Sequence, residues 1–128
     1  SDNPQRPFSI ETSQERANQM FTFAEFMIQG YVGKITALSK CLKITVAASE
    51  RWTDRETGEA REKTRWNTVT FWERSPGFDW IKANLKTGDL VHVRGDIEDV
   101  TFEKDGETVY ATDLRADRIS LIPTGKGR

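Results

Sequence analysis

Two tryptophans share the polar side of one predicted strand. The segment 64–73 alternates in character: one parity holds Trp66, Thr68, Thr70 and Trp72, and the other holds Asn67, Val69 and Phe71. Because side chains two residues apart share a face of a strand, we expect both indole rings on the solvent side and the apolar pair in the core. An exposed ring is a platform on which any nucleobase can stack, at about 1–3 kcal/mol per base. The alternative is that a neighbouring subunit or the N-terminal segment covers the rings.

Basic residues gather in the same part of the chain. Between Lys34 and Lys86 there are eleven Lys or Arg and seven Asp or Glu residues, although the whole chain has a net charge of -1 and a pI near 5.9. Between Asp89 and Arg118 there are four basic and nine acidic residues. A polyanion is therefore expected to meet the first stretch and avoid the second. Candidate phosphate contacts are Lys43, Arg51, Arg55, Arg65 and Arg74, with Lys34 and Lys86 further away; an ordinary solvated charge explains each about equally well.

Metal chemistry has little support. Cys41 and His92 are the only soft ligands, whereas a zinc site takes about three or four. We expect Cys41 to be a small buried hydrophobe and His92 to lie on the outer face of a strand. A single cysteine forms no internal disulfide, which favours a reducing compartment. No apolar run approaches the roughly 18 residues of a membrane span, and the N-terminus does not read as a secretion signal.

Catalysis has equally little support. A metal-dependent nuclease would need Asp96, Glu98 and Asp99 as carboxylate ligands. Adjacent strand residues point to opposite faces, and no base or nucleophile accompanies these three. We therefore expect no enzyme, no catalytic residue, no metal and no cofactor.

Hydrophobic periodicity predicts five strands and one helix. The strands are expected at 26–35, 42–48, 64–73, 89–102 and 109–122, and the helix at 75–85. Glycines inside the first strand (Gly30, Gly33) and the fourth (Gly95) indicate bulges or bends. A charged loop is expected over 53–63 with its turn at Gly58, and Lys104-Asp-Gly-Glu107 predicts a hairpin turn.

The same periodicity predicts which side chains enter the core. In the fourth strand the inward residues are Val91, Val93 and Ile97. The helix would have Ser75 as its N-cap, Pro76 in its first turn, and an apolar stripe of Phe78, Ile81 and Leu85. Trp80 is expected to pack against the barrel edge and is not counted as a site.

Three strands, a helix and a two-stranded hairpin form the element order of an all-β, five-stranded Greek-key barrel, the oligonucleotide-binding (OB) fold. The barrel is expected over 26–122, after a polar N-terminal arm over 1–25 and before a short C-terminal end over 123–128. Within the arm, Thr12 and Glu15 could form a capping box that opens a short helix through Met20.

Five motifs occur in order along the chain: Met27-Ile-Gln-Gly-Tyr-Val-Gly33, Ala47-Ala-Ser-Glu-Arg-Trp52, Thr64-Arg-Trp-Asn-Thr-Val-Thr-Phe-Trp72, Leu85-Lys-Thr-Gly-Asp-Leu-Val-His-Val-Arg-Gly95 and Lys104-Asp-Gly-Glu-Thr-Val-Tyr110. In this order and at matching spacing, they resemble bacterial single-stranded DNA-binding proteins over about 27–122. The resemblance implies sequence-tolerant binding and protection of single-stranded DNA in replication, repair and recombination. It places Trp52, Trp66, Trp72 and Phe102 at base-stacking positions. Simple alternation puts Trp52 on the apolar parity, so a bulge near Ser49 would be needed to turn it outward.

The resemblance also implies a homo-oligomer, a tetramer or a dimer, and an acidic tail that recruits replication or repair proteins. Here Asn67 replaces a histidine that helps to form the tetramer, and the chain ends at Arg128 with basic residues. Either a tail has been removed or this is a divergent member, for example one encoded on a mobile element. Acidic residues before Phe102 replace the family's basic stretch, which favours a minor DNA role for that hairpin. The rival hypothesis is an OB-fold protein-interaction module with weak or no DNA affinity.

Overall fold

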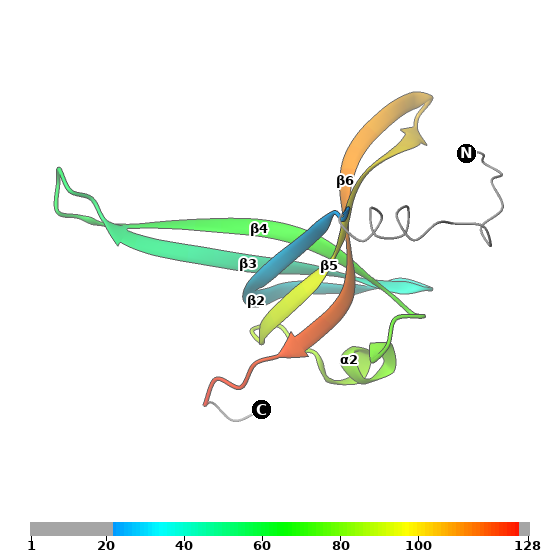
Figure 1. Ribbon diagram of the computed structural model, residues 1–128, viewed down its shortest axis with the longest axis horizontal. Helices are drawn as coiled ribbons and strands as arrows, with labels where there is room; N and C mark the ends of the chain where they lie inside the picture. The colour runs from blue at the N-terminus through cyan, green and yellow to red at the C-terminus, as the bar shows by residue number, and fades with distance from the viewer. Residues whose placement is uncertain (1–21, 126–128) are drawn as a thin grey trace.

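Five strands close into a barrel in the computed structural model, which describes residues 22–125. The elements are β2 (Glu25–Ala37), β3 (Cys41–Thr53), β4 (Ala60–Trp72), α2 (Phe78–Asn84), β5 (Leu90–Lys104) and β6 (Glu107–Leu121). The strand order is β2-β3-β4-β6-β5, and β2 pairs with both β3 and β5 (Figure 1). All pairs are antiparallel except β4 with β6, which closes the barrel in parallel. This arrangement confirms the expected OB fold.

The interior is filled by the apolar parity of each strand. Val69, Phe71, Val91 and Val93 are fully buried, as the alternation predicts, and Cys41 is a buried free thiol. Helix α2 lies at the end of the molecule opposite the turn that joins β3 and β4 (Figure 1). It adds the predicted stripe of Phe78, Ile81 and Leu85 to the core. The rings of Phe71 and Phe78 have centroids 5.6 Å apart, so the helix is held directly against the strand that carries the tryptophans.

Bends in β2 and β5 allow the barrel to close. The β2–β3 register shifts between Val32 and Ile35, and the β5–β6 register shifts at Arg94 and Gly95, which confirms both predicted irregularities. A Cβ at Gly30 would collide with the carbonyl oxygen of Ala47, so only glycine lets β2 approach β3 this closely.

Two hairpins continue beyond the barrel in different directions (Figure 1). We call residues 48–65 of β3 and β4 the β3–β4 arm, and residues 97–114 of β5 and β6 the β5–β6 arm. The predicted loop at 53–63 is too long, because strand pairing continues to Thr53 and Ala60 and leaves a turn at 54–59. Gly58 is the expected turn residue, with φ 74°. Cross-strand ion pairs let charged residues occupy this solvated ribbon.

Other expectations need correction or lie outside the described residues. Ile97 is not a core residue but 38% exposed, because β5 has left the barrel at that point. Ser75 is not the N-cap: α2 begins at Phe78 after Gly77, whose φ is 81°. Trp80 is largely exposed rather than packed. The β5–β6 turn is confirmed, with Asp105 and Gly106 at positive φ. The helix expected before Met20 lies outside the described residues.

Candidate nucleic-acid interface

Trp66 lies flat across the outer surface of the barrel. It is 60% exposed and pairs with Ala47 of β3. A Cβ built on Gly33 of β2 would lie 2.6 Å from Cζ3 of Trp66 and 2.8 Å from the hydroxyl oxygen of Thr45. The indole therefore extends from β4 over β3 to β2 and occupies the space that a side chain at Gly33 would need. Its other face remains open to solvent, which is the geometry of a stacking platform.

Trp72 lies on the same parity of β4 as Trp66, six residues further along. That separation corresponds to about 20 Å along an extended strand. The ring is 39% exposed. Between the two tryptophans, Thr70 is buried, and its hydroxyl accepts a hydrogen bond of 2.7 Å from Nζ of Lys43. The structure thus places an ammonium group between two exposed indoles on one face.

Trp52 lies on the β3–β4 arm, on the opposite side of the ribbon from Trp66. The β3–β4 register runs without a shift from Cys41 opposite Trp72 to Thr53 opposite Ala60, so there is no bulge near Ser49. Trp52 therefore keeps the parity of Ala48, which faces away from the Trp66 side. Its ring is half exposed because the arm extends beyond the barrel, and neither face of a free ribbon is covered.

Phe102 is half exposed as well, but it lies on the β5–β6 arm opposite Val109. The two arms point in different directions, so Phe102 and Trp52 do not form one continuous surface (Figure 1). The four aromatic residues that the resemblance singles out thus divide into a pair on the barrel and one residue on each arm.

The candidate basic residues divide in the same way. Arg51 lies on the Trp66 side of the β3–β4 arm and is bound to Glu62 at 3.3 Å, whereas Arg65 lies on the other side and is bound to Glu50 at 3.2 Å. The remaining candidates are exposed: Arg55 in the turn of that arm, Arg74 after Trp72, Lys34 on β2 and Lys86 after α2.

The turn of the β3–β4 arm is organised by Asp54. Its carboxylate accepts hydrogen bonds from the backbone amides of Glu56 and Thr57 and from Nε of Arg61. The two backbone hydrogen bonds, with help from Arg61, hold the pKa of Asp54 below its ordinary value. The charged form of Asp54 is therefore part of the turn at neutral pH.

Sequence reasoning missed Tyr31. This side chain is 54% exposed and pairs with Ala47 from the β2 side, so the three residues Tyr31, Ala47 and Trp66 form one row across three strands. Beside this row is a pocket of about 420 Å³, lined by Gln29, Gly30, Tyr31, Ala47, Ser49, Arg51, Glu62 and Leu90. The signal for it in the sequence is the alternation of Gln29 and Tyr31 with Gly30 and Val32, which are buried.

The described residues hold no group of three or more His, Cys, Asp or Glu side chains placed to bind a metal ion. His92 lies between two buried valines with its ring outward, and its Nδ1 is 3.3 Å from Oε1 of Gln29. Asp96 is bound to Arg115. Over the same part of the chain, no helix is long and apolar enough to cross a membrane.

Comparison with known proteins gives a consistent result. Residues 25–122 match the family described as the single-strand binding protein family. The chain is 28% identical over 80 residues to the single-stranded DNA-binding protein 1 of Xylella fastidiosa (strain 9a5c). That similarity covers 62% of this chain and 57% of the relative, so only part of the relative's length is represented.

Solved structures show the same fold at low identity. A Plasmodium falciparum SSB in complex with ssDNA superposes with a TM-score of 0.63 at 22% identity, covering 80% of this chain and 97% of that one. A small single-stranded DNA-binding protein from Streptomyces coelicolor gives a TM-score of 0.56 at 20% identity, covering 80% and 96%.

Proposed function

The chain belongs to the single-strand binding protein family, and we propose that it binds and protects single-stranded DNA with little regard to sequence. Bases would stack on exposed aromatic side chains, while Lys and Arg residues neutralise phosphates. Single-strand binding proteins are not enzymes, and they serve replication, repair and recombination in general. The alternative of a protein-interaction module without DNA affinity is not favoured by the family match.

The observation that carries the proposal is the position of the Trp66 ring. A ring that extends over Gly33, with its outer face in solvent, stabilises little of the core and is available to a planar ligand. Lys43 lies between Trp66 and Trp72 on the same face, where a phosphate between two stacked bases would pass. Stacking needs only the π-face of a base, so this surface tolerates any sequence.

A fluorescence titration tests the proposal directly. Oligo-dT should quench tryptophan emission, and the logarithm of the binding constant should fall with the logarithm of salt concentration by about 0.7 per phosphate contacted. Duplex DNA of the same length is the control and should bind much more weakly. Equal affinity for duplex, or no binding of oligo-dT, would refute the function.

We propose a path for the strand over the barrel and along the β3–β4 arm. Trp66 and Trp72 would be the central stacking residues, and Trp52 would contribute from the far side of the arm. The phosphate contacts would come from Lys43, Arg51, Arg55, Arg65 and Arg74, with Lys34 and Lys86 at the edge. Phe102 would have a minor role, because acidic residues surround it on the β5–β6 arm.

We also propose that the protein is a homo-oligomer, a tetramer or a dimer, in the bacterial cytoplasm. The large exposed side chains of Phe23, Met27 and Leu38 are consistent with further burial between copies, which would add to the stability of a small domain. Light scattering at micromolar concentration should give a mass above that of one 14.6 kDa chain. The monomer mass would refute this assembly.

A further inference from the structure

We propose that the pocket beside Tyr31 is an additional subsite for one nucleobase, stacked on the Tyr31 ring. The inference rests on the proposed function, since it extends the same surface from Trp66 to β2. The pocket volume of about 420 Å³ lies within the usual range for small-ligand sites and exceeds what one base requires.

Small residues create the space. Neighbouring strands are about 4.8 Å apart, so the backbones carrying Tyr31 and Trp66 are about 10 Å apart, with Ala47 between them. The side chain of Ala47 is a single methyl group, and Gly30 lines the pocket through its backbone alone. The exposed side chains of Tyr31 and Trp66 therefore lie on either side of Ala47 on the outer surface. A planar ring can lie against Ala47 between them.

The charges in the pocket select an uncharged ligand. Arg51 and Glu62 are the only charged lining residues, and they are bound to each other at 3.3 Å. Because these charges cancel locally, the pocket has no net attraction for a phosphate while Arg51 and Glu62 remain paired. A neutral heteroaromatic ring meets no such penalty.

Polar groups at the rim suit the edge of a base. The Ser49 hydroxyl is 2.7 Å from the hydroxyl of Thr64, and the Gln29 carbonyl oxygen is near His92. A hydroxyl has one donor and two acceptor positions, and an amide nitrogen has two donors, so both groups retain capacity toward a ligand. Every base has ring nitrogens or carbonyl oxygens that can form hydrogen bonds with these two groups.

The pocket is continuous with the Trp66 platform. The indole extends toward Gly33 and Thr45, whereas the pocket is lined from the other direction by Ser49 and Arg51. Ala47 therefore separates two adjacent subsites on one surface. A strand that stacks a base on Trp66 can place a neighbouring base on Tyr31 without leaving the outer face of the barrel.

Substitution of Tyr31 tests the subsite. Y31A should weaken oligo-dT binding by about five- to tenfold, near the lower end of what one stacked base contributes. Y31F retains the ring and should bind within about twofold of the wild type. Y110A is the matched control, because Tyr110 is 79% exposed but lies on the β5–β6 arm, and it should leave binding unchanged.

A photo-crosslink and the oligomer mass separate the outcomes. Oligonucleotides that carry 5-iodouracil should form a photo-crosslink to Tyr31 of the wild-type protein, which mass spectrometry would locate. Unaltered binding by Y31A, while the wild type binds oligo-dT, would overturn this subsite and leave the proposed function standing; absence of wild-type binding would refute the function itself. A lower oligomer mass in Y31A with unchanged affinity would also overturn the subsite, because Tyr31 would then be a subunit contact.

Discussion

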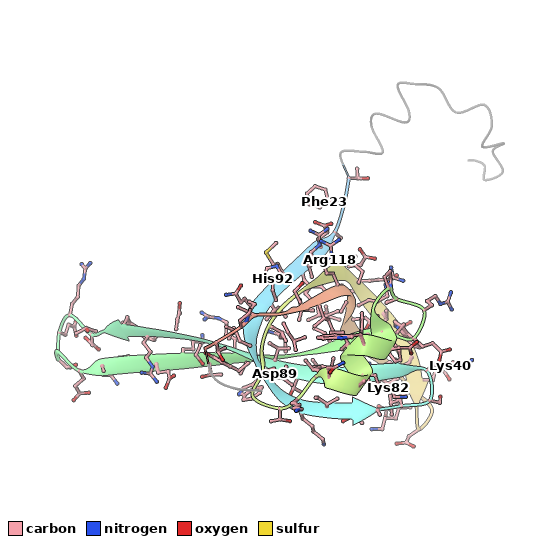
Figure 2. The ribbon with its side chains drawn as sticks, turned by 90° about the horizontal axis from the view of Figure 1, so that it is seen from below. Phe23, Lys40, Lys82, Asp89, His92 and Arg118 are labelled. Carbon is pink, nitrogen blue, oxygen red and sulfur yellow. The ribbon has the colours of Figure 1, made fainter. Side chains whose placement is uncertain are left out.

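The β3–β4 arm and the β5–β6 arm share one architecture and differ in charge. Each is a two-stranded ribbon that extends from the barrel, with one aromatic residue of the candidate site, Trp52 or Phe102. Figure 2 shows that the side chains fill the barrel interior, while those of the β3–β4 arm project from both sides of the ribbon. Residues 48–65 contain five basic and five acidic side chains, whereas residues 97–114 contain one basic and six acidic side chains.

The difference shows that fold alone does not assign a DNA contact. A phosphate backbone along the β3–β4 arm would meet guanidinium groups that can exchange a carboxylate partner, Glu62 or Glu50, for a phosphate. Along the β5–β6 arm it would meet an excess of carboxylates and release few counterions. The strand should therefore follow the first arm and avoid the second, although both present an exposed aromatic ring.

The largest effect should come from the barrel on which both arms depend. Phe71→Ala should lower the free energy of unfolding by about 3–5 kcal/mol, because the ring is fully buried and contacts Phe78 of α2. Trp52→Ala and Phe102→Ala should change it little, since neither ring fills the core. Chemical denaturation measures all three. Comparable losses from an arm residue would show that the arm is packed in solution.

The next largest effect should separate the stacking residues. Trp66→Ala and Trp72→Ala should each weaken oligo-dT binding by about 1–3 kcal/mol and leave the fold intact. Phe102→Ala should cost less than Trp66→Ala, because few phosphates approach the acidic arm. Titration at constant salt, with a thermal melt of each variant, makes the comparison. A greater loss at Phe102 than at Trp66 would reverse the assignment of the two arms.

Alternation predicted the barrel and the sides of β4 on which its apolar residues and Trp66 lie, although Thr70 on the outer side is buried and Asn67 on the inner parity is exposed. Val69 and Phe71 are buried and Trp66 is exposed for the reason that the pattern indicates, and the same holds for Val91 and Val93. The pattern fails where strands leave the barrel. Ile97 keeps the inward parity but has no interior to enter.

Features that depend on partners across strands could not be predicted. The extension of β3 and β4 through the expected loop depends on pairs such as Arg51 with Glu62 and Ser49 with Thr64, which a single sequence does not reveal. Tyr31 belongs to the site only because Ala47 brings it into line with Trp66.

The start of α2 was also predicted wrongly. Gly77 rather than Ser75 precedes α2, because the chain makes a separate turn at Ser75 first.

Charge reversal on the two arms should change DNA affinity less than the loss of a stacking residue does, and it compares the arms directly. Glu98→Lys with Asp99→Lys places one new cation on each side of the β5–β6 arm, because adjacent residues face opposite sides. If the strand stays beyond the screening length of about 8 Å at physiological salt, affinity should change less than about twofold and the salt slope should not change.

Glu62→Lys is the matched change on the β3–β4 arm. It frees Arg51 and adds a cation beside the proposed path, so it should tighten binding severalfold and steepen the salt slope. A steeper slope from the β5–β6 double variant would mean that DNA passes along the acidic arm. Weaker binding by that variant, while still folded, would contradict the whole charge argument.

The smallest effect should be a pH response confined to the turn of the β3–β4 arm. The pKa of Asp54 is lowered by hydrogen bonds from the amides of Glu56 and Thr57, and by Arg61. A carboxyl group whose pKa is lower in the folded protein stabilises the turn at pH values above 3.8, its ordinary pKa. That contribution is lost as the pH falls through the pKa of the folded protein.

An NMR titration should therefore give a midpoint below 3.8 for Asp54, with the amide shifts of Glu56 and Thr57 following it. Asp54→Asn keeps an acceptor oxygen without the charge, so these amides should no longer respond in that window. A midpoint at or above 3.8 would mean that the carboxylate does not hold this turn in solution, and that the two arms differ in charge but not in how their turns are fixed.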